Sequence, residues 1–407
     1  MVNAKHLTYG GLIFAITVII LGGYAIYNSS QNNLDNQTIS GNFLHVEGDK
    51  VIDSSGNIIY LRGFNLGPLP FASIKNGNYT QDQVNQYNKA ALDAFVAEDD
   101  IKNIKSMGGN VIRIHLDFFA LENSPYNYND EYLELYNKLA VESYKKGVYI
   151  IPASGAAQNS KQQDNIARYN GETYLYKDAE FRKRFIDAWG HIAKYLADNP
   201  GIAGYDILNE PEAPTKEDLH SVYSELISEI RKYDKNHIII LERQHFSNSD
   251  QFLFGGFYND TNIMLSTHYY EDEALTGGTG EKYTNKEQLE QGITDFLSLE
   301  EAQGKPFFLG EFSAETKING STPEALRWTT DFIGIMKQKG VHFAYFPYKG
   351  IYAYWDYHDN GASRGLYQYT SAPNQSESIE QKINNLHTEN LKEFFEIRNI
   401  LENGFKD

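Results

Sequence analysis

Two glutamates stand where apolar segments end, which is a costly place for a carboxyl group. Glu210 follows the run Ile202–Leu208 within Asn209-Glu210-Pro211, and Glu311 follows the run Pro306–Gly310. An ionisable group beside a core costs free energy unless it is paired, so packing alone does not explain these positions. Hydrolysis of glycosidic bonds uses a pair of carboxyl groups. We therefore predict that Glu210 and Glu311 are catalytic.

The elements that must position these residues alternate along the chain. Eight short apolar runs are separated by stretches of helical period or by long loops, a pattern that favours a (β/α)₈ TIM barrel over an open sheet. The runs are Ile58–Phe64, Asn110–Leu116, Val148–Pro152, Ile202–Leu208, His237–Leu241, Ile263–His268, Pro306–Leu309 and Val341–Phe346. Helices are expected within Gln83–Ser106, Glu131–Lys146, Phe181–Leu196, Lys216–Lys232, Lys286–Gln303, Pro323–Lys339 and Glu377–Leu401. In such barrels the chemistry lies at the C-terminal ends of the strands, where both glutamates fall.

The N-terminal part of the chain differs from the rest in composition. Residues 1–27 carry the uncharged stretch Gly10–Tyr27 after Lys5, which predicts a membrane anchor on the extracellular face or, alternatively, a cleaved signal peptide of a secreted protein. Residues 28–42 are polar and predict a linker, and residues 43–407 form the predicted catalytic barrel domain. A β-hairpin is expected at its start, around the turn Asp53–Gly56.

The bulk composition excludes some classes of function. The net charge of −18 would repel nucleic acid, so no nucleic-acid partner is expected. The chain has no cysteine, which excludes disulfides and thiolate metal sites. The histidines show no pattern of metal ligands, and we expect neither a metal nor a cofactor. A monomer is expected.

Further side chains near the predicted strand ends could support the two glutamates. Arg113 could hold the Glu311 carboxylate in a bidentate contact. Tyr270 shares the strand face of His268, because alternate residues of a strand point the same way. His115 is a candidate for the barrel mouth, and Lys349 is a candidate substrate contact from the loop that follows.

In these residues the chain resembles glycoside hydrolase family 5, the cellulase-like family of the Glu/Glu barrel clan. The matching residues are Leu61-Arg-Gly-Phe-Asn65, Arg113, Asn209-Glu210-Pro211, His268, Tyr270 and Glu311, in the strand order of the family. The resemblance implies that Glu210 is the acid/base and Glu311 the nucleophile of a retaining reaction. It also implies that Asn209 binds the sugar 2-hydroxyl and that Tyr270 orients Glu311, with His268 and Arg113 supporting the site.

The chain departs from the family pattern at two strands. Ser154 stands near the end of the third strand, where a histidine is usual, and Phe346 stands at the eighth, where a tryptophan platform is usual. Trp355 in the following loop could supply the missing stacking surface. These departures leave the sugar open, and a β-linked carbohydrate of glucan or mannan type is expected. A transglycosylase of the same clan and a non-catalytic glycan-binding barrel are the alternatives.

Overall fold

Eight parallel strands close into a barrel in the computed structural model, in the order β10-β11-β14-β3-β4-β7-β8-β9. Their bounds are β3 (Arg62–Leu66), β4 (Val111–Leu116), β7 (Tyr149–Ser154), β8 (Gly204–Asp206), β9 (Ile238–Glu242), β10 (Ile263–Tyr270), β11 (Phe307–Ser313) and β14 (His342–Tyr345). Each strand overlaps one of the apolar runs, so the predicted (β/α)₈ barrel is confirmed.

The structure describes most of the chain from residue 42 onward. The described residues are 42–66, 80, 82–83, 85–87, 89–90, 97–116, 118–154, 174–244, 253–270, 285–314, 316–317, 320–321, 323–350, 362–363, 365–369, 378, 380–381 and 391–406. The predicted anchor of residues 1–27, nearly all of the predicted linker and Trp355 lie outside this set. Within the set, no helix is long and apolar enough to cross a membrane.

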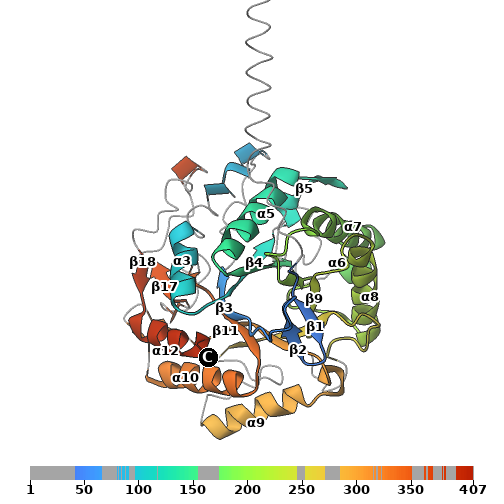
Figure 1. The fold of residues 1–407 in the computed structure, drawn as a ribbon. Helices are drawn as coiled ribbons and strands as arrows, with labels where there is room; N and C mark the ends of the chain where they lie inside the picture. Colours follow the sequence, from blue (N-terminus) through green and yellow to red (C-terminus); the bar gives the residue numbers. More distant parts are fainter. Residues whose placement is uncertain are drawn as a thin grey trace, which may run out of the picture. The chain divides into compact units, whose positions relative to one another are not determined.

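Helices surround the barrel (Figure 1). They are α3 (Glu98–Ser106), α4 (Phe118–Leu121), α5 (Asp130–Lys145), α6 (Tyr174–Lys177), α7 (Ala179–Leu196), α8 (Lys216–Tyr233), α9 (Lys286–Leu297), α10 (Pro323–Gln338) and α12 (Phe395–Phe405), with a 3₁₀ turn at Glu300–Ala302. Side chains of the residue before the helix accept its first free N–H groups at Asn129, Asp178, Thr215 and Asn285. Such caps explain why these helices begin where they do.

Two helix predictions need correction. The stretch Gln83–Ser106 is not one helix, because Ala97 is extended and its N–H donates to the Asp100 carboxylate as α3 begins. The stretch Glu377–Leu401 is also divided. Its residues Leu391–Glu393 form β18, which pairs antiparallel with β17 (Tyr367–Tyr369), and the helix starts only at Phe395. In both cases the backbone is set by a partner that the helical period does not reveal, a side-chain carboxylate for Ala97 and strand β17 for Leu391–Glu393.

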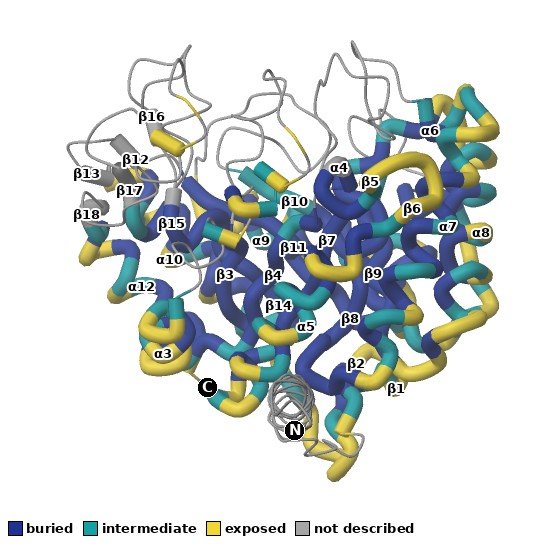
Figure 2. The backbone as a smooth tube through the Cα atoms, turned by 90° about the horizontal axis from the view of Figure 1, so that it is seen from above, coloured by how far each residue is buried: buried dark blue, intermediate teal, exposed yellow. Residues whose placement is uncertain are grey.

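The core has two layers, because alternate residues of each strand face opposite sides. Small or branched side chains such as Val111, Ile151, Ala203 and Ile240 fill much of the barrel interior, and the larger cluster packs between the strands and the helices. Figure 2 shows the buried strands enclosed by helices whose outer turns are exposed. Since the interior is packed with side chains, any pocket must lie at the ends of the strands.

An antiparallel pair closes the N-terminal end of the barrel. Strands β1 (His45–Glu47) and β2 (Lys50–Ile52) meet at a turn through Gly48, earlier than the expected turn at Asp53–Gly56. That second turn follows β2 and returns Ile58 to a bridge with Ile52. Leu44 and Val51 pack in the interior layer, so this end is filled and the opposite end is left for the site. Small two- and three-stranded sheets add to the periphery: β5 (Glu122–Ser124) with β6 (Asn127–Tyr128), β12 (Thr316–Lys317) with β13 (Gly320–Ser321) and β16 (Ala362–Ser363), and β15 (Lys349–Gly350) with β17 and β18.

Candidate active site

Glu311 faces the barrel interior because strand β11 carries an irregularity at Gly310. Phe308 belongs to the interior layer and Leu309 to the outer one, so strict alternation would turn Glu311 outward. The register of β11 shifts here instead, and Glu311, not Gly310, is paired with His268. A Cβ on Gly310 would come within 2.8 Å of the Ser266 hydroxyl and 3.0 Å of His268 Nε2. Glycine is therefore what permits the bulge that aims Glu311 inward.

Arg113 holds the centre of the site from strand β4 and is fully buried. It follows Val111 on the inward-facing side, so it lies within the strand, below the mouth rather than at the strand tip. Its guanidinium donates to three carboxyl groups and two amides: Asp206 Oδ2 at 2.8 Å, Glu242 Oε1 at 2.8 Å, Glu311 Oε1 at 2.7 Å, Asn65 Oδ1 at 3.0 Å and Asn209 Oδ1 at 2.7 Å. A rigid planar fork of donors suits this convergence better than an ammonium would.

Both oxygens of Glu311 are held. Oε1 accepts from Arg113, and Oε2 accepts from the Tyr270 hydroxyl at 2.5 Å. Burial raises the pKa of this carboxyl, but the positive charges of His268 and Arg113 prevail and hold it well below its usual range. Glu311 is therefore ionised at neutral pH, which is the state that a nucleophile requires.

His115 stands beside this carboxylate on strand β4. Its Nε2 lies 2.9 Å from Arg113 Nη1 and 3.3 Å from Glu311 Oε1. Burial lowers the pKa of His115, so the ring is neutral at neutral pH and can accept a hydrogen bond from the guanidinium. Tyr136 donates to the His115 carbonyl at 2.6 Å and fixes the strand end.

Glu210 lies just beyond strand β8 in an unusual backbone conformation. Its φ is +46°, in the left-handed region that a non-glycine residue seldom adopts. The side chain is 29% exposed, and its Oε1 lies 2.9 Å from His268 Nδ1. The preceding residue is anchored as well, because the Asn209 N–H donates to the Ser154 hydroxyl at 2.8 Å. Ser154, which replaces the family histidine, thus supports the chain that carries Glu210.

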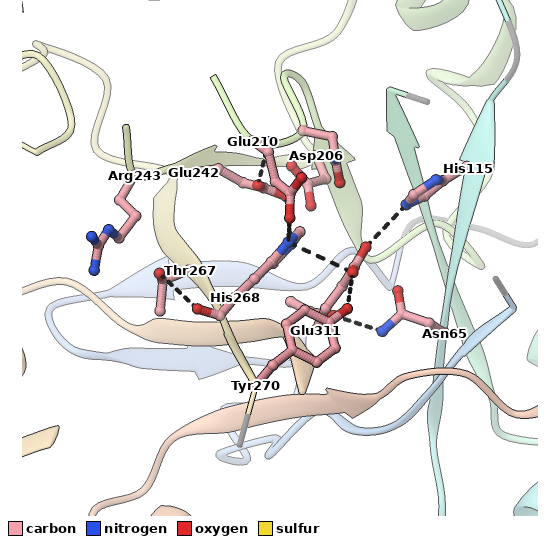
Figure 3. A network of polar contacts seen from close by, with 12 residues as sticks. Asn65, His115, Asp206, Glu210, Glu242, Arg243, Thr267, His268, Tyr270 and Glu311 are labelled. Carbon is pink, nitrogen blue, oxygen red and sulfur yellow. Dashed lines mark hydrogen bonds and ion pairs between the residues drawn. The ribbon is translucent and has the colours of Figure 1, made fainter. Parts of the chain in front are cut away.

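The two glutamates face one another across the mouth (Figure 3). One oxygen of each carboxylate and one ring nitrogen of His268 all lie within 4.8 Å of one another. This separation is close to the roughly 5–5.5 Å of retaining glycosidases and well short of the roughly 6.5–9.5 Å of inverting ones. The three side chains offer a geometry that a cation could use, but Arg113, His115 and Tyr270 already contact the oxygens of Glu311.

The structure adds three polar residues that the sequence prediction did not place in the site. Glu242, at the end of β9, accepts the N–H of Glu210 at 2.7 Å, and Asp206 accepts from Arg113 beneath it. Asn65 donates to the carbonyls of Gly310 and Ala344 and so satisfies the backbone around the bulge. The alternation of residues along a strand could have placed Glu242 in the site, because Glu242 lies on the same strand face as Ile238 and Ile240, which belong to the interior layer.

The buried charges of the site balance in pairs. Burial lowers the pKa of His268, but Glu242 and Glu311 raise it well above its usual range, so the ring is an imidazolium. Burial raises the pKa of Glu242, but His268 and Arg113 bring it to about 2. Burial and the adjacent Glu242 raise the pKa of Asp206 well above its usual range, so it is protonated at neutral pH. Two cations therefore face the two anions Glu242 and Glu311, and such pairing is what makes buried charge tolerable.

The remaining candidates lie at different distances from this cluster. Phe346 is buried beside Tyr270, with ring centroids 6.2 Å apart in an edge-to-face arrangement. The ammonium of Lys349 forms an ion pair with Asp100 at 2.5 Å. Its role as a substrate contact stays a prediction, as does that of Trp355, which lies outside the described residues.

Comparisons with known proteins agree with this geometry. The model of the family "Cellulase (glycosyl hydrolase family 5)" matches residues 74–351, which is more than half of the chain. A beta-xylosidase of Phanerodontia chrysosporium is 28% identical over 233 residues, which cover 52% of this chain and 48% of that protein, so this chain spans about half of that relative. Endoglucanase C of Acetivibrio thermocellus is 20% identical over 334 residues, which cover 72% of this chain and 92% of that protein.

A similar barrel occurs among solved structures. A beta-glucanase of Saccharophagus degradans, crystallised with cellotetraose, superposes with a TM-score of 0.60 at 14% identity, covering 91% of this chain and 96% of that one. This likeness supports the fold, and the family match and the sequence relatives support the reaction class. The chain therefore belongs to glycosyl hydrolase family 5.

Proposed function

We propose that the chain is a retaining β-glycoside hydrolase in which Glu311 is the nucleophile and Glu210 the acid/base. The observation that carries the proposal is the approach of the two carboxylates to within 4.8 Å, which suits double displacement. Their unequal surroundings assign the roles. Glu311 is buried and held by Arg113 and Tyr270, whereas Glu210 is 29% exposed and free to exchange a proton with substrate and water.

The first step forms a covalent intermediate. A carboxylate oxygen of Glu311 attacks the anomeric carbon while the Glu210 carboxyl protonates the departing glycosidic oxygen. The bond between that oxygen and the anomeric carbon breaks, and a glycosyl ester of Glu311 remains. Arg113 and Tyr270 hold the attacking carboxylate in one orientation, so little entropy is lost in orienting it when the transition state forms.

The second step releases the sugar. Glu210, now a carboxylate, removes a proton from water, and the resulting oxygen attacks the anomeric carbon and displaces Glu311. Asn209 is the group we assign to the sugar 2-hydroxyl. Its carbonyl oxygen accepts from Arg113, so its NH₂ group is the part that can donate to a hydroxyl.

The nucleophile can be identified by trapping. A dinitrophenyl 2-deoxy-2-fluoro glycoside should inactivate the enzyme, and mass mapping should place the adduct on Glu311. A label on any other residue would refute the assignment. Glu210→Ala should lose most activity and recover part of it with azide, which attacks the intermediate without needing a base. Absence of a glycosyl azide product would count against Glu210.

We propose a β-linked glucan or mannan type of substrate, endo or exo. A relative named as an endoglucanase supports a glucan, and one named as a beta-xylosidase supports a β-linked carbohydrate. The buried Phe346 beside Tyr270 offers a narrower apolar surface than a tryptophan would. Reducing-end release from β-1,4-glucan, β-1,3-glucan, mannan, xylan and a glycolipid, with and without an acceptor sugar, would identify the substrate and separate hydrolysis from transglycosylation.

We also propose that the enzyme acts outside the cell, held by residues 1–27 or released after their cleavage. The support is the composition of that segment, with Lys5 ahead of an uncharged stretch. Full-length protein should partition with membranes or appear in the medium, and a variant lacking residues 1–27 should remain in the cytoplasm. Retention of the full-length chain in the cytoplasm would contradict the proposal.

A further inference from the structure

Glu242 is the buried acid of the site that the reaction scheme does not use. It is the last residue of β9, and its side chain is 2% exposed. The charged and titratable groups that face it come from other elements: Arg113 of β4, Asp206 of β8, Glu210 beyond β8 and His268 of β10, while Tyr223 of α8 donates to its backbone carbonyl at 2.7 Å. A carboxylate so enclosed has no access to substrate.

Its two oxygens reach two different parts of the acid/base apparatus (Figure 3). Oε2 accepts the backbone N–H of Glu210 at 2.7 Å, which is where the chain takes its left-handed φ of +46°. Such a conformation persists only where the surroundings enforce it. Oε1 lies 3.1 Å from His268 Nε2, and the other nitrogen of that ring lies 2.9 Å from the Glu210 carboxylate. Glu242 thus contacts Glu210 directly at the backbone and indirectly at the side chain.

We propose that Glu242 is a positioning residue of the reaction, which fixes the backbone of Glu210 and keeps His268 charged so that the ring holds the Glu210 carboxyl toward the substrate. The inference rests on the proposed role of Glu210 as acid/base. The groups that face His268 are Glu210, Glu242 and Glu311, and the positive charge of His268 in turn lowers the pKa of His115. Of the two buried acids among them, Glu242 is the one that does not take part in bond making.

The test is Glu242→Gln, which keeps the shape and removes the charge. Hydrolysis of an unactivated glycoside depends on proton donation, so its kcat/KM should fall about 10–100-fold, a part of the roughly 10²–10⁴-fold that acid–base catalysis contributes. Cleavage of a dinitrophenyl glycoside, whose leaving group needs no proton, should change its kcat/KM by less than about threefold. A merely structural role would lower both values by the same factor.

Glu301→Gln is the matched control. Glu301 is also a buried glutamate that accepts backbone N–H groups, from Gly256 at 2.8 Å and Phe254 at 3.3 Å, but it lies outside the site. This variant should lose some stability and keep both kcat/KM values. Wild-type enzyme is measured with both glycosides and with the fluoro sugar. If the proposed glycosidase function were wrong, the wild type itself would cleave neither glycoside and would not be labelled at Glu311, whatever the variants do.

A second measurement reads the charge of His268 itself. In wild-type protein with isotope-labelled histidine rings, NMR should show His268 as an imidazolium at pH 8, and Glu242→Gln should shift its titration to lower pH. The signal is assigned from the spectrum of His268→Gln. A neutral His268 in the wild type at pH 7 would overturn the proposal without any variant. Equal losses on the two glycosides would overturn it as well.

Discussion

The two ends of the barrel bury the same kinds of side chain and use them differently. At the N-terminal ends of β8 and β9, Asp234 accepts from Tyr205 at 2.7 Å and lies 2.5 Å from His237 Nδ1. The other ring nitrogen of His237 lies 2.9 Å from the Asn199 carbonyl. This cluster is closed: the Asp234 side chain is 0% exposed, and its acid and histidine are three residues apart in one turn.

The C-terminal end also joins an acid, a histidine and a tyrosine, here Glu311, His268 and Tyr270. His268 and Tyr270 lie on β10 and Glu311 lies on the neighbouring β11, where it also accepts from the buried Arg113 of β4. One more acid, Glu210, remains 29% exposed at the mouth. The comparison teaches that a carboxylate, a histidine and a tyrosine do not make an active site by themselves. Two features distinguish the C-terminal end. It buries more charged side chains, whose charges balance, and one of its acids is exposed to solvent.

Removing the nucleophile should produce the largest difference between the two ends. We expect Glu311→Gln to lower kcat by on the order of 10⁴-fold or more, because no other group can form the glycosyl ester. Glu301→Gln, at a glutamate with the same 5% exposure but outside the mouth, should keep wild-type kcat. Steady-state rates with an aryl glycoside measure both. Substantial turnover by the Glu311 variant would mean that Glu311 is not the nucleophile and that the polar cluster at the mouth is structural.

The buried arginine should dominate the stability of the catalytic end. Arg113→Met leaves Glu242 and Glu311 without their shared cation, and breaking a buried ion pair in this way costs about 3–5 kcal/mol. Urea unfolding at pH 7 should show this loss. The matched control is Arg398→Met, since Arg398 also pairs with two acids but is 19% exposed, and it should lose no more than about 1 kcal/mol. Equal losses would mean that burial does not distinguish the two arginines.

The closed cluster should affect stability in a pH-dependent way and leave catalysis alone. Burial raises the pKa of Asp234, but the hydrogen bonds and charge of His237 and the Tyr205 hydroxyl lower it to about 2, below the 3.8 of an unperturbed aspartate. The pKa of Asp234 is lower in the folded protein than in the unfolded chain. The contribution of Asp234 to the free energy of unfolding is therefore present above pH 3.8 and disappears as the pH falls toward 2. Asp234→Asn should therefore lose about 2 kcal/mol at pH 6 and converge with the wild type near pH 2, at unchanged kcat. A reduced kcat at full folding would link this end of the barrel to the reaction.

The bulge at Gly310 tests how exactly the mouth is shaped. In Gly310→Ala the new methyl group would press on the Ser266 hydroxyl and on His268 Nε2. We expect about a tenfold loss of kcat/KM and about 1–3 kcal/mol of stability, as for an overpacked core. Gly334→Ala is the control, because a Cβ there meets nothing within 4 Å. If both variants behave alike, the side chains at the mouth accommodate the methyl group.

The fold could be predicted because its signals are local. Apolar runs of strand length separated by helical periods led to the barrel, and each run became one of its strands. The ends of helices were harder to predict, since they depend on hydrogen-bond partners that the helical spacing of apolar residues does not show. Ala97 is held by the Asp100 carboxylate, and Leu391–Glu393 pair with β17, neither of which the spacing of apolar residues reveals.

The site could be predicted in part. Glu210, Glu311, Arg113, Asn209, His268 and Tyr270 stand in a motif order that has a family precedent, and the structure brings them together. Glu242 and Asp206 were not singled out, because an acid at the end of a strand or within one looks the same whether it faces water or an arginine. Lys349 was singled out for its place in the loop, and its partner Asp100 is 249 residues away.

The sequence by itself determined the alternation of strands and helices and the family, and it singled out the two carboxylates as candidates, because each of these depends on the type and spacing of neighbouring residues. Only the tertiary structure decided that the carboxylates lie within 4.8 Å and that a bulge at Gly310 turns Glu311 inward. It also decided that Glu242 and His268 contact Glu210. Closure of the barrel is the physical reason. It brings strands that are distant in sequence to one mouth, where burial makes the charge of each group depend on that of the others.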